Sequence, residues 1–161
     1  MKKLLVLTLV LGIASLAPAT LQISVNGNPD PLDSEIVIGP SDELILDVHT
    51  DVALPYTGTY LLMVVDTAQG TLSGGAPTQG GVSSELNYYA AYWAASIGRE
   101  GASAIANVSD TGAGTVFTGQ IYDQILFHCE KIGDATVQLY GSADSVMWEL
   151  QDTLIIHQIP D

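Results

Sequence analysis

Short runs that alternate apolar with polar residues, each ended by turn-forming residues, constrain the fold of this chain most. Residues 21–25 alternate as Leu-Gln-Ile-Ser-Val and end at Asn26-Gly27, a dipeptide that strongly favours a tight turn between two strands. Similar runs recur along the chain, and 60–65 is continuously apolar, as expected of a strand in the middle of a sheet. We predict strands at 21–25, 35–38, 44–49, 60–65, 121–129, 135–140, 146–150 and 153–159.

Short strands separated by regular turns predict a mainly β protein, a two-layer antiparallel β-sandwich of Greek-key or jelly-roll type. Residues 84–97 depart from this pattern and predict one inserted amphipathic helix. Its apolar residues recur at steps of three and four, which places them on one face. They are Leu86, Ala90, Trp93 and Ile97.

The same segment carries a cluster of aromatic side chains. We predict that Tyr89 and Trp93 pack the helix against a sheet. Tyr88 and Tyr92 are one turn apart on the outer side, and are candidates for contact with a partner or a sugar ring. The glycine-rich tracts on either side, 69–81 and 98–119, match no phosphate-binding loop, and we predict that they are surface loops.

The first residues predict export from the cytoplasm. Lys2 and Lys3 precede an apolar run over 4–16, which is followed by Ala17-Pro18-Ala19. This is the layout of a secretory signal peptide, residues 1–19, cleaved after Ala19. The alternative is a retained N-terminal helix. We expect a secreted or cell-surface protein with a single β-sandwich domain at 20–161 and no stable membrane insertion after cleavage.

The charge of the chain excludes two classes of partner. The formal net charge is −14, and loss of Lys2 and Lys3 would leave two basic residues against 18 acidic ones, a net charge of −16. Such a chain repels the phosphates of nucleic acids and of anionic lipids. We therefore expect no nucleic-acid partner.

The single cysteine lies in a stretch that also holds a histidine and acids, Ile125 to Tyr140. Because side chains alternate along a strand, Cys129 shares a face with Ile125 and Phe127, while His128 and Glu130 point the other way. We predict a buried, unreactive thiol. Neither a nucleophile with its base nor a zinc-ligand spacing is present, so we expect no enzyme.

One acidic segment is a candidate calcium site. Asn28, Asp30, Asp33 and Glu35 gather oxygen ligands within a short stretch, although their spacing does not match an EF-hand loop. The alternative is a solvated acidic turn. We expect no required cofactor, with calcium as the candidate ion.

Three stretches resemble a known group of proteins. They are ISVNGNPDPLDSEIVIGPSDELILDVHT, GQIYDQILFHCEKIGDATVQL and LIIHQIP. Together they resemble secreted proteins of planctomycete-type bacteria, which are cohesin-related or jelly-roll β-sandwiches. Many of those carry a PEP-CTERM sorting tail directly after the last stretch, whereas this chain stops at Pro160-Asp161. The resemblance implies no catalytic residues, does not extend to 56–119, and suggests a freely exported form.

These observations predict a structural or interaction protein of the extracellular matrix or cell surface. Its partner would be another copy of itself, another extracellular protein, or a polysaccharide. A homopolymer would form through the terminal strands. One alternative is a carbohydrate-binding module that uses Tyr88 and Tyr92, with or without calcium. Another is a secreted hydrolase, since glycosidase carboxylates can lie anywhere in a sequence. The residues of the terminal strands are Leu21, Ile23, Val25, Leu154, Ile156 and Ile159.

Overall fold

The computed structural model describes residues 21–29, 31, 36–55, 59–78, 90–99, 102–108, 116–142, 144 and 146–160. The elements of the first half are β1 (Leu21–Val25), β2 (Asn28–Pro29), β3 (Val37–Ile38), β4 (Glu43–Pro55), β5 (Thr59–Asp66) and β6 (Gly70–Pro77). Those of the second half are α1 (Ala90–Ser96), β7 (Ala102–Val108), β8 (Val116–Cys129), β9 (Gly133–Ser142) and β10 (Glu149–Gln158).

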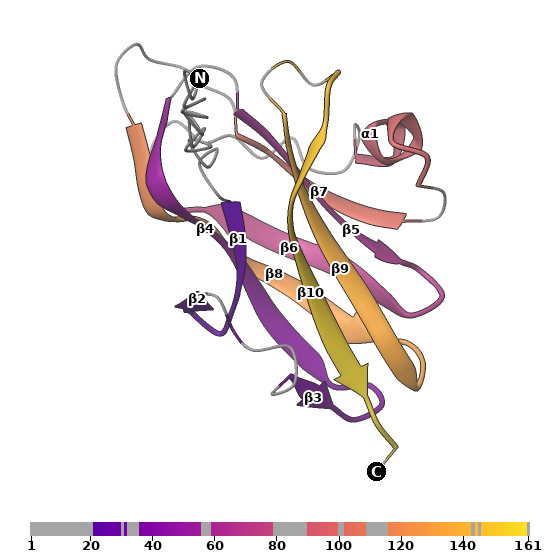
Figure 1. The fold of residues 1–161 in the computed structure, drawn as a ribbon. Coiled ribbons are helices and arrows are strands. Elements are labelled where there is room, and N and C mark those ends of the chain that lie inside the picture. Colours follow the sequence, from indigo (N-terminus) through magenta and orange to yellow (C-terminus); the bar gives the residue numbers. More distant parts are fainter. Residues whose placement is uncertain are drawn as a thin grey trace, which may run out of the picture.

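The strands form two sheets that face each other (Figure 1). Sheet A has the order β2-β1-β4-β8-β6, and sheet B has the order β3-β10-β9-β5-β7. Neighbouring strands are antiparallel except for the short β3, which pairs parallel with β10. The predicted mainly β, two-layer architecture is confirmed.

The core lies between the sheets and follows from the alternation of side chains. Every second residue of the central strands points inward, and these side chains form one buried cluster. Burying an aliphatic or aromatic side chain of this size stabilises the fold by about 1.5–3 kcal/mol. Among the fully buried members are Leu46, Ile125 and Phe127 of sheet A and Leu61, Leu139 and Ile156 of sheet B.

The predicted turn after β1 is present. Asn26 and Gly27 have φ of 51° and 78°, and Val25 pairs with Asn28 across the turn. Positive φ at both central residues is what a two-residue hairpin turn requires, and asparagine and glycine adopt it at low cost.

Helix α1 packs on the outer face of sheet B, beside β5 and β7 (Figure 1). Trp93 is buried there between the rings of Tyr60 and Trp148, with ring centroids 5.7 and 5.3 Å away. The packing role predicted for Trp93 is confirmed, whereas Tyr89 lies outside the described residues. No helix within the described ranges is long and apolar enough to cross a membrane.

Two predictions about loops are wrong. The glycine-rich tracts contain β6 and β7, which extend sheets A and B at one edge. Glycine is required in β6 because aromatic rings occupy the place of its side chains. A Cβ at Gly70 would lie 2.4 Å from the ring of Phe127, and one at Gly75 would lie 2.4 Å from the ring of Tyr122.

The prediction of two separate strands near the end of the chain is also wrong. Glu149–Gln158 is one strand with a register shift between Leu150 and Asp152. Val146 and Met147 instead lie in the loop before it, where their backbone N–H groups donate to Asp144 Oδ1, each at 2.8 Å. These hydrogen bonds, Met147 first and Val146 second, hold the pKa of Asp144 below its ordinary value.

Candidate interaction surface

The outer face of sheet A presents an apolar pair in the middle of three adjacent strands. Leu46, Ile125 and Phe127 point into the core, so Ile45 of β4 and Leu126 of β8 point outward. The two are directly opposite each other, and Ser73 of β6 follows in the same row. Ile45 is 44% exposed and Leu126 is half-buried. Cross-strand aliphatic side chains at this register lie in contact.

The next row of the same face is polar and acidic. Glu43, His128 and Thr71 lie side by side on β4, β8 and β6. Glu43 Oε1 is 3.8 Å from His128 Nδ1, and Glu130 is exposed just beyond the end of β8. Acidic side chains therefore border the apolar pair at this end of the sheet. A contact this exposed contributes little to stability, and the carboxylates of Glu43 and Glu130 stay available to a partner.

On the other side of the apolar pair, a buried carboxylate fixes the backbone. Asp47 is 3% exposed. Its Oδ2 accepts from Ser24 Oγ at 3.2 Å and from Gly27 N at 3.0 Å, and its Oδ1 accepts from Gln124 N at 3.3 Å. Gln124 has a φ of 58°, an unfavourable conformation for a residue with a side chain, at a point where the β4–β8 register shifts. Asp47 thus joins the β1–β2 turn, β4 and β8 beside Ile45.

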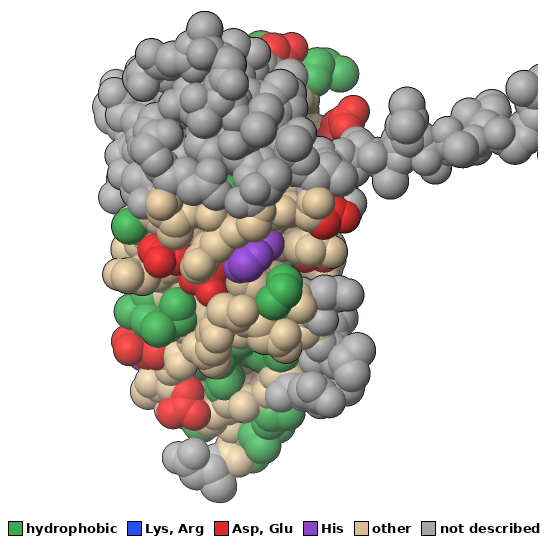
Figure 2. Space-filling view, turned by 90° about the vertical axis from the view of Figure 1, so that its left-hand side faces the viewer, with side chains coloured by type: hydrophobic (Ala, Val, Ile, Leu, Met, Phe, Trp, Pro, Cys, Tyr) green, Lys and Arg blue, Asp and Glu red, His purple; other side chains and the backbone are tan. Residues whose placement is uncertain are grey.

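Figure 2 shows the side of the molecule on which β1, β2 and β4 lie in Figure 1. Apolar and acidic side chains are interspersed among polar ones in the described part of this side, where a histidine is visible but no Lys or Arg. The only Lys and Arg in the described ranges are Arg99 and Lys131. The described surface on this side is therefore suited to a partner that carries positive charge.

The residues of the predicted thiol region are arranged as expected. Cys129 is free and 3% exposed, and its thiol is 3.8 Å from the carbonyl oxygen of Lys131. Glu130 is exposed and His128 is half-buried on the opposite face of the strand. The predicted burial of Cys129 is confirmed.

We expect the thiol of Cys129 to react with a thiol reagent at least about tenfold more slowly in the native protein than after denaturation, because buried thiols are reached only by opening of the fold. Mass spectrometry of labelled protein over time measures both rates. A variant with an exposed cysteine, Ser73→Cys, provides the control and should label rapidly in the native state. Equal native rates at the two positions would contradict the prediction.

The calcium and aromatic predictions lie mostly outside the described residues. Asn28 is exposed in β2, whereas Asp30, Asp33 and Glu35 are not among the described residues. The described ranges contain no group of three or more His, Cys, Asp or Glu placed to hold a metal ion. Tyr92 is 70% exposed on α1, and Tyr88 is not described. The roles given to these residues stay predictions.

The terminal strands occupy the core of their own chain. Five of the six side chains named for assembly are at most 9% exposed, and Ile159 is 50% exposed. Strand β1 pairs with β4 along its whole length, and Ile23 N donates to Asp152 Oδ2 of β10 at 2.6 Å. Assembly by exchange of these strands would break these contacts before remaking them in a neighbour, and it stays a prediction.

The histidines do not converge. His49 and His128 lie on β4 and β8 of sheet A, whereas His157 lies on β10 of sheet B. His157 Nδ1 is 2.8 Å from Asp134 Oδ1, a cross-strand pair on the outer face of that sheet.

The alternation in 44–46 already indicates that Ile45 points away from the core. Its meeting with Leu126 depends on the β4–β8 register, which the local sequence does not specify.

Comparisons with known proteins identify the fold. No protein-family model matches the chain, and no curated protein matches it. A cohesin module from a family 33 glycoside hydrolase of Clostridium perfringens has a TM-score of 0.53 at 8% identity, over 89% of this chain and 99% of the module. The seventh ScaB type I cohesin of Pseudobacteroides cellulosolvens has a TM-score of 0.46 at 12% identity, over 78% and 92% of the two chains. The first comparison confirms a cohesin-like β-sandwich fold.

Proposed function

We propose that this chain is a non-enzymatic interaction module that binds a partner protein through the outer face of sheet A. The observation that carries the proposal is the in-register pair Ile45 and Leu126, an apolar centre on an ordered sheet face. Among the described elements, α1 packs on sheet B, and no helix or strand packs across this face of sheet A. Apolar side chains at the centre of a polar face are typical anchors of protein interfaces.

The charge around the apolar pair favours a partner of opposite charge. Glu43 and Glu130 border the pair, and the chain carries a net charge of −14. Two copies of this face would repel each other, which disfavours a symmetric dimer through it. The proposed partner presents an apolar side chain flanked by lysine or arginine, so that its charges meet the acidic border.

Two further observations support this function. The cohesin module with the similar fold is one part of a glycoside hydrolase, which is compatible with a module that serves a larger assembly instead of catalysing a reaction. Residues 1–19 have the layout of a signal peptide, which is compatible with a partner outside the cell or at its surface.

Selection from a random peptide library displayed on phage tests the proposal, because the library offers many combinations of apolar and charged residues to the same surface. We expect the selected peptides to combine an apolar anchor with lysine or arginine. Ile45→Ser should weaken their binding by about tenfold, because it removes the apolar contact at the centre. Affinity should also fall as salt is added, since screening weakens the attraction between exposed charges.

The matched control is Val37→Ser. Val37 is 47% exposed, close to the exposure of Ile45, but lies on β3 of sheet B. This variant should bind the selected peptides as tightly as the unmodified protein. Equal binding by the Ile45→Ser variant, or selected peptides that lack positive charge, would overturn the proposal.

A further inference from the structure

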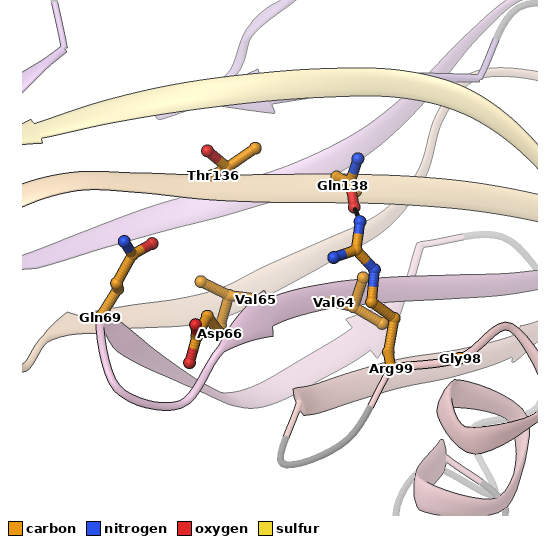
Figure 3. A pocket seen from close by; sticks show the side chains of 8 residues that line it. All are labelled: Val64, Val65, Asp66, Gln69, Gly98, Arg99, Thr136 and Gln138. Carbon is orange, nitrogen blue, oxygen red and sulfur yellow. Dashed lines mark hydrogen bonds between the residues drawn. The ribbon is translucent and has the colours of Figure 1, made fainter.

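A pocket of about 440 Å³ lies on the outer face of sheet B, on the other sheet from Ile45 and Leu126 (Figure 3). Its volume is within the range of small-molecule sites. Three segments meet there: the end of β5 with the turn that follows it, the residues after α1, and β9. The lining residues are Val64, Val65, Asp66, Gln69, Gly98, Arg99, Thr136 and Gln138.

The end of α1 places the arginine in this pocket. Gly98 has a φ of 74°, and the N–H groups of Gly98 and Arg99 donate to Ala95 and Ala94 carbonyls at 3.0 and 2.9 Å. These bonds end the helix and turn the chain towards sheet B. The guanidinium then reaches across to β9, where it donates to Gln138 Oε1 (Figure 3).

The hydrogen bonds of Gln138 within the protein use its acceptor oxygen and leave its donor groups for a ligand. Its Oε1 accepts from both Arg99 and Tyr140 Oη, the latter at 3.2 Å. Its amide N–H groups have no partner among the described residues, and Arg99 forms no salt bridge with a described carboxylate. Donors from both side chains therefore remain available at the pocket.

The rest of the lining combines two neutral polar side chains and one acid with two valines and a glycine. Gln69 projects from the β5–β6 turn, at the far end of the pocket from Arg99, and Thr136 lies two residues before Gln138 on β9 (Figure 3). An amide and a hydroxyl can each donate and accept. The carboxylate of Asp66 is partly used, since its Oδ1 accepts from Ala68 N at 2.8 Å.

The hydrogen-bonding groups and charges of the lining favour one class of ligand over two others. An apolar ligand would leave the amides and the guanidinium without partners, which is costly. An anion would be attracted by Arg99 but opposed by Asp66 and by the net charge of −14. A neutral molecule with several hydroxyl groups can satisfy donors and acceptors at once. We infer that this pocket binds a neutral saccharide, held by the side chains of Arg99, Gln138, Thr136 and Gln69.

NMR titration of the isotope-labelled protein tests this inference with glucose, N-acetylglucosamine and cellobiose as neutral probes. Glucuronate is the anionic probe, and glycerol is the small polyol probe. We expect at least one neutral saccharide to shift the side-chain signals of Arg99, Gln69 and Gln138 at lower concentration than glucuronate or glycerol. Gln138→Glu should weaken this binding by about tenfold, because it keeps the acceptor for Arg99 and Tyr140 but removes the amide donor.

The control variant is Gln22→Ala, a half-buried glutamine on β1 of sheet A, which should bind the saccharide unchanged. The inference is overturned if no neutral saccharide shifts these signals, if glucuronate binds more tightly than every neutral probe, or if glycerol binds equally well. Because Ile45 and this pocket lie on different sheets, neither result depends on the outcome of the peptide selection.

Discussion

Replacement of Asp47 by alanine is expected to lower the free energy of unfolding by about 3 kcal/mol, since a buried donor that loses its acceptor costs about 1–3 kcal/mol. The carboxylate serves three donors, the hydroxyl of Ser24 and the backbone N–H groups of Gly27 and Gln124. Because Asp47 is only 3% exposed, water cannot easily take the place of its carboxylate as the acceptor for these three donors. In a chain of this size the loss corresponds to a fall in Tm of roughly 6–12 °C.

Urea denaturation measures the change, with the same slope of unfolding free energy against urea concentration expected for the variant and the unmodified protein. Asp51→Ala is the control, because Asp51 is an exposed acid on the same strand and its loss should change stability by no more than about 0.5 kcal/mol. Asp47→Asn should be intermediate, since it keeps one acceptor oxygen but turns an amide donor towards other donors. If Asp47→Ala is as stable as Asp51→Ala, the carboxylate does not hold the β1–β2 turn and the β8 irregularity together.

Gly75→Ala is expected to destabilise the fold by about 3 kcal/mol, as the sum of two effects. Its φ of 96° is unfavourable for alanine, which costs about 1–2 kcal/mol. The new Cβ would also lie 2.4 Å from Cε1 of Tyr122, a fully buried ring that cannot move aside, and overpacking of this kind costs about 1–3 kcal/mol.

Gly119→Ala separates the two effects. Gly119 also has a positive φ, 74°, but nothing lies within 4 Å of the position of its Cβ. We expect it to cost about 1–2 kcal/mol, which leaves a difference from Gly75→Ala that reports on packing alone. A double-mutant cycle of Gly75→Ala with Tyr122→Leu should show a favourable coupling of about 1 kcal/mol or more. Equal costs at the two glycines would mean that the Tyr122 ring does not require glycine in β6.

Local sequence determined the strands whose side chains alternate. At 121–129 the alternation identified both the strand and the face that enters the core, and burial of Ile125, Phe127 and Cys129 agrees with it. The Asn26-Gly27 turn and the packing of Trp93 were also predictable. In each case the signal comes from residues a few positions apart, because the periods of strands and helices are short.

Glycine-rich β6 had no such signal. A strand whose only large apolar side chain is Leu72 shows no alternation, so its composition alone resembles a loop. Its place beside β8 is decided by hydrogen bonds to that strand and by the rings of Phe127 and Tyr122, which fill the space above Gly70 and Gly75. These rings are far away in sequence, and their effect exists only in the folded chain.

Both candidate sites depend on the same kind of long-range pairing. Ile45 meets Leu126 only through the β4–β8 register, and Arg99 meets Gln138, 39 residues away, only because α1 packs on sheet B. The sequence by itself determined which residues face outward and that the surface is acidic. Only the tertiary structure decided which outward-facing residues lie together, because strand order and register are set by contacts between distant segments and not by local periodicity.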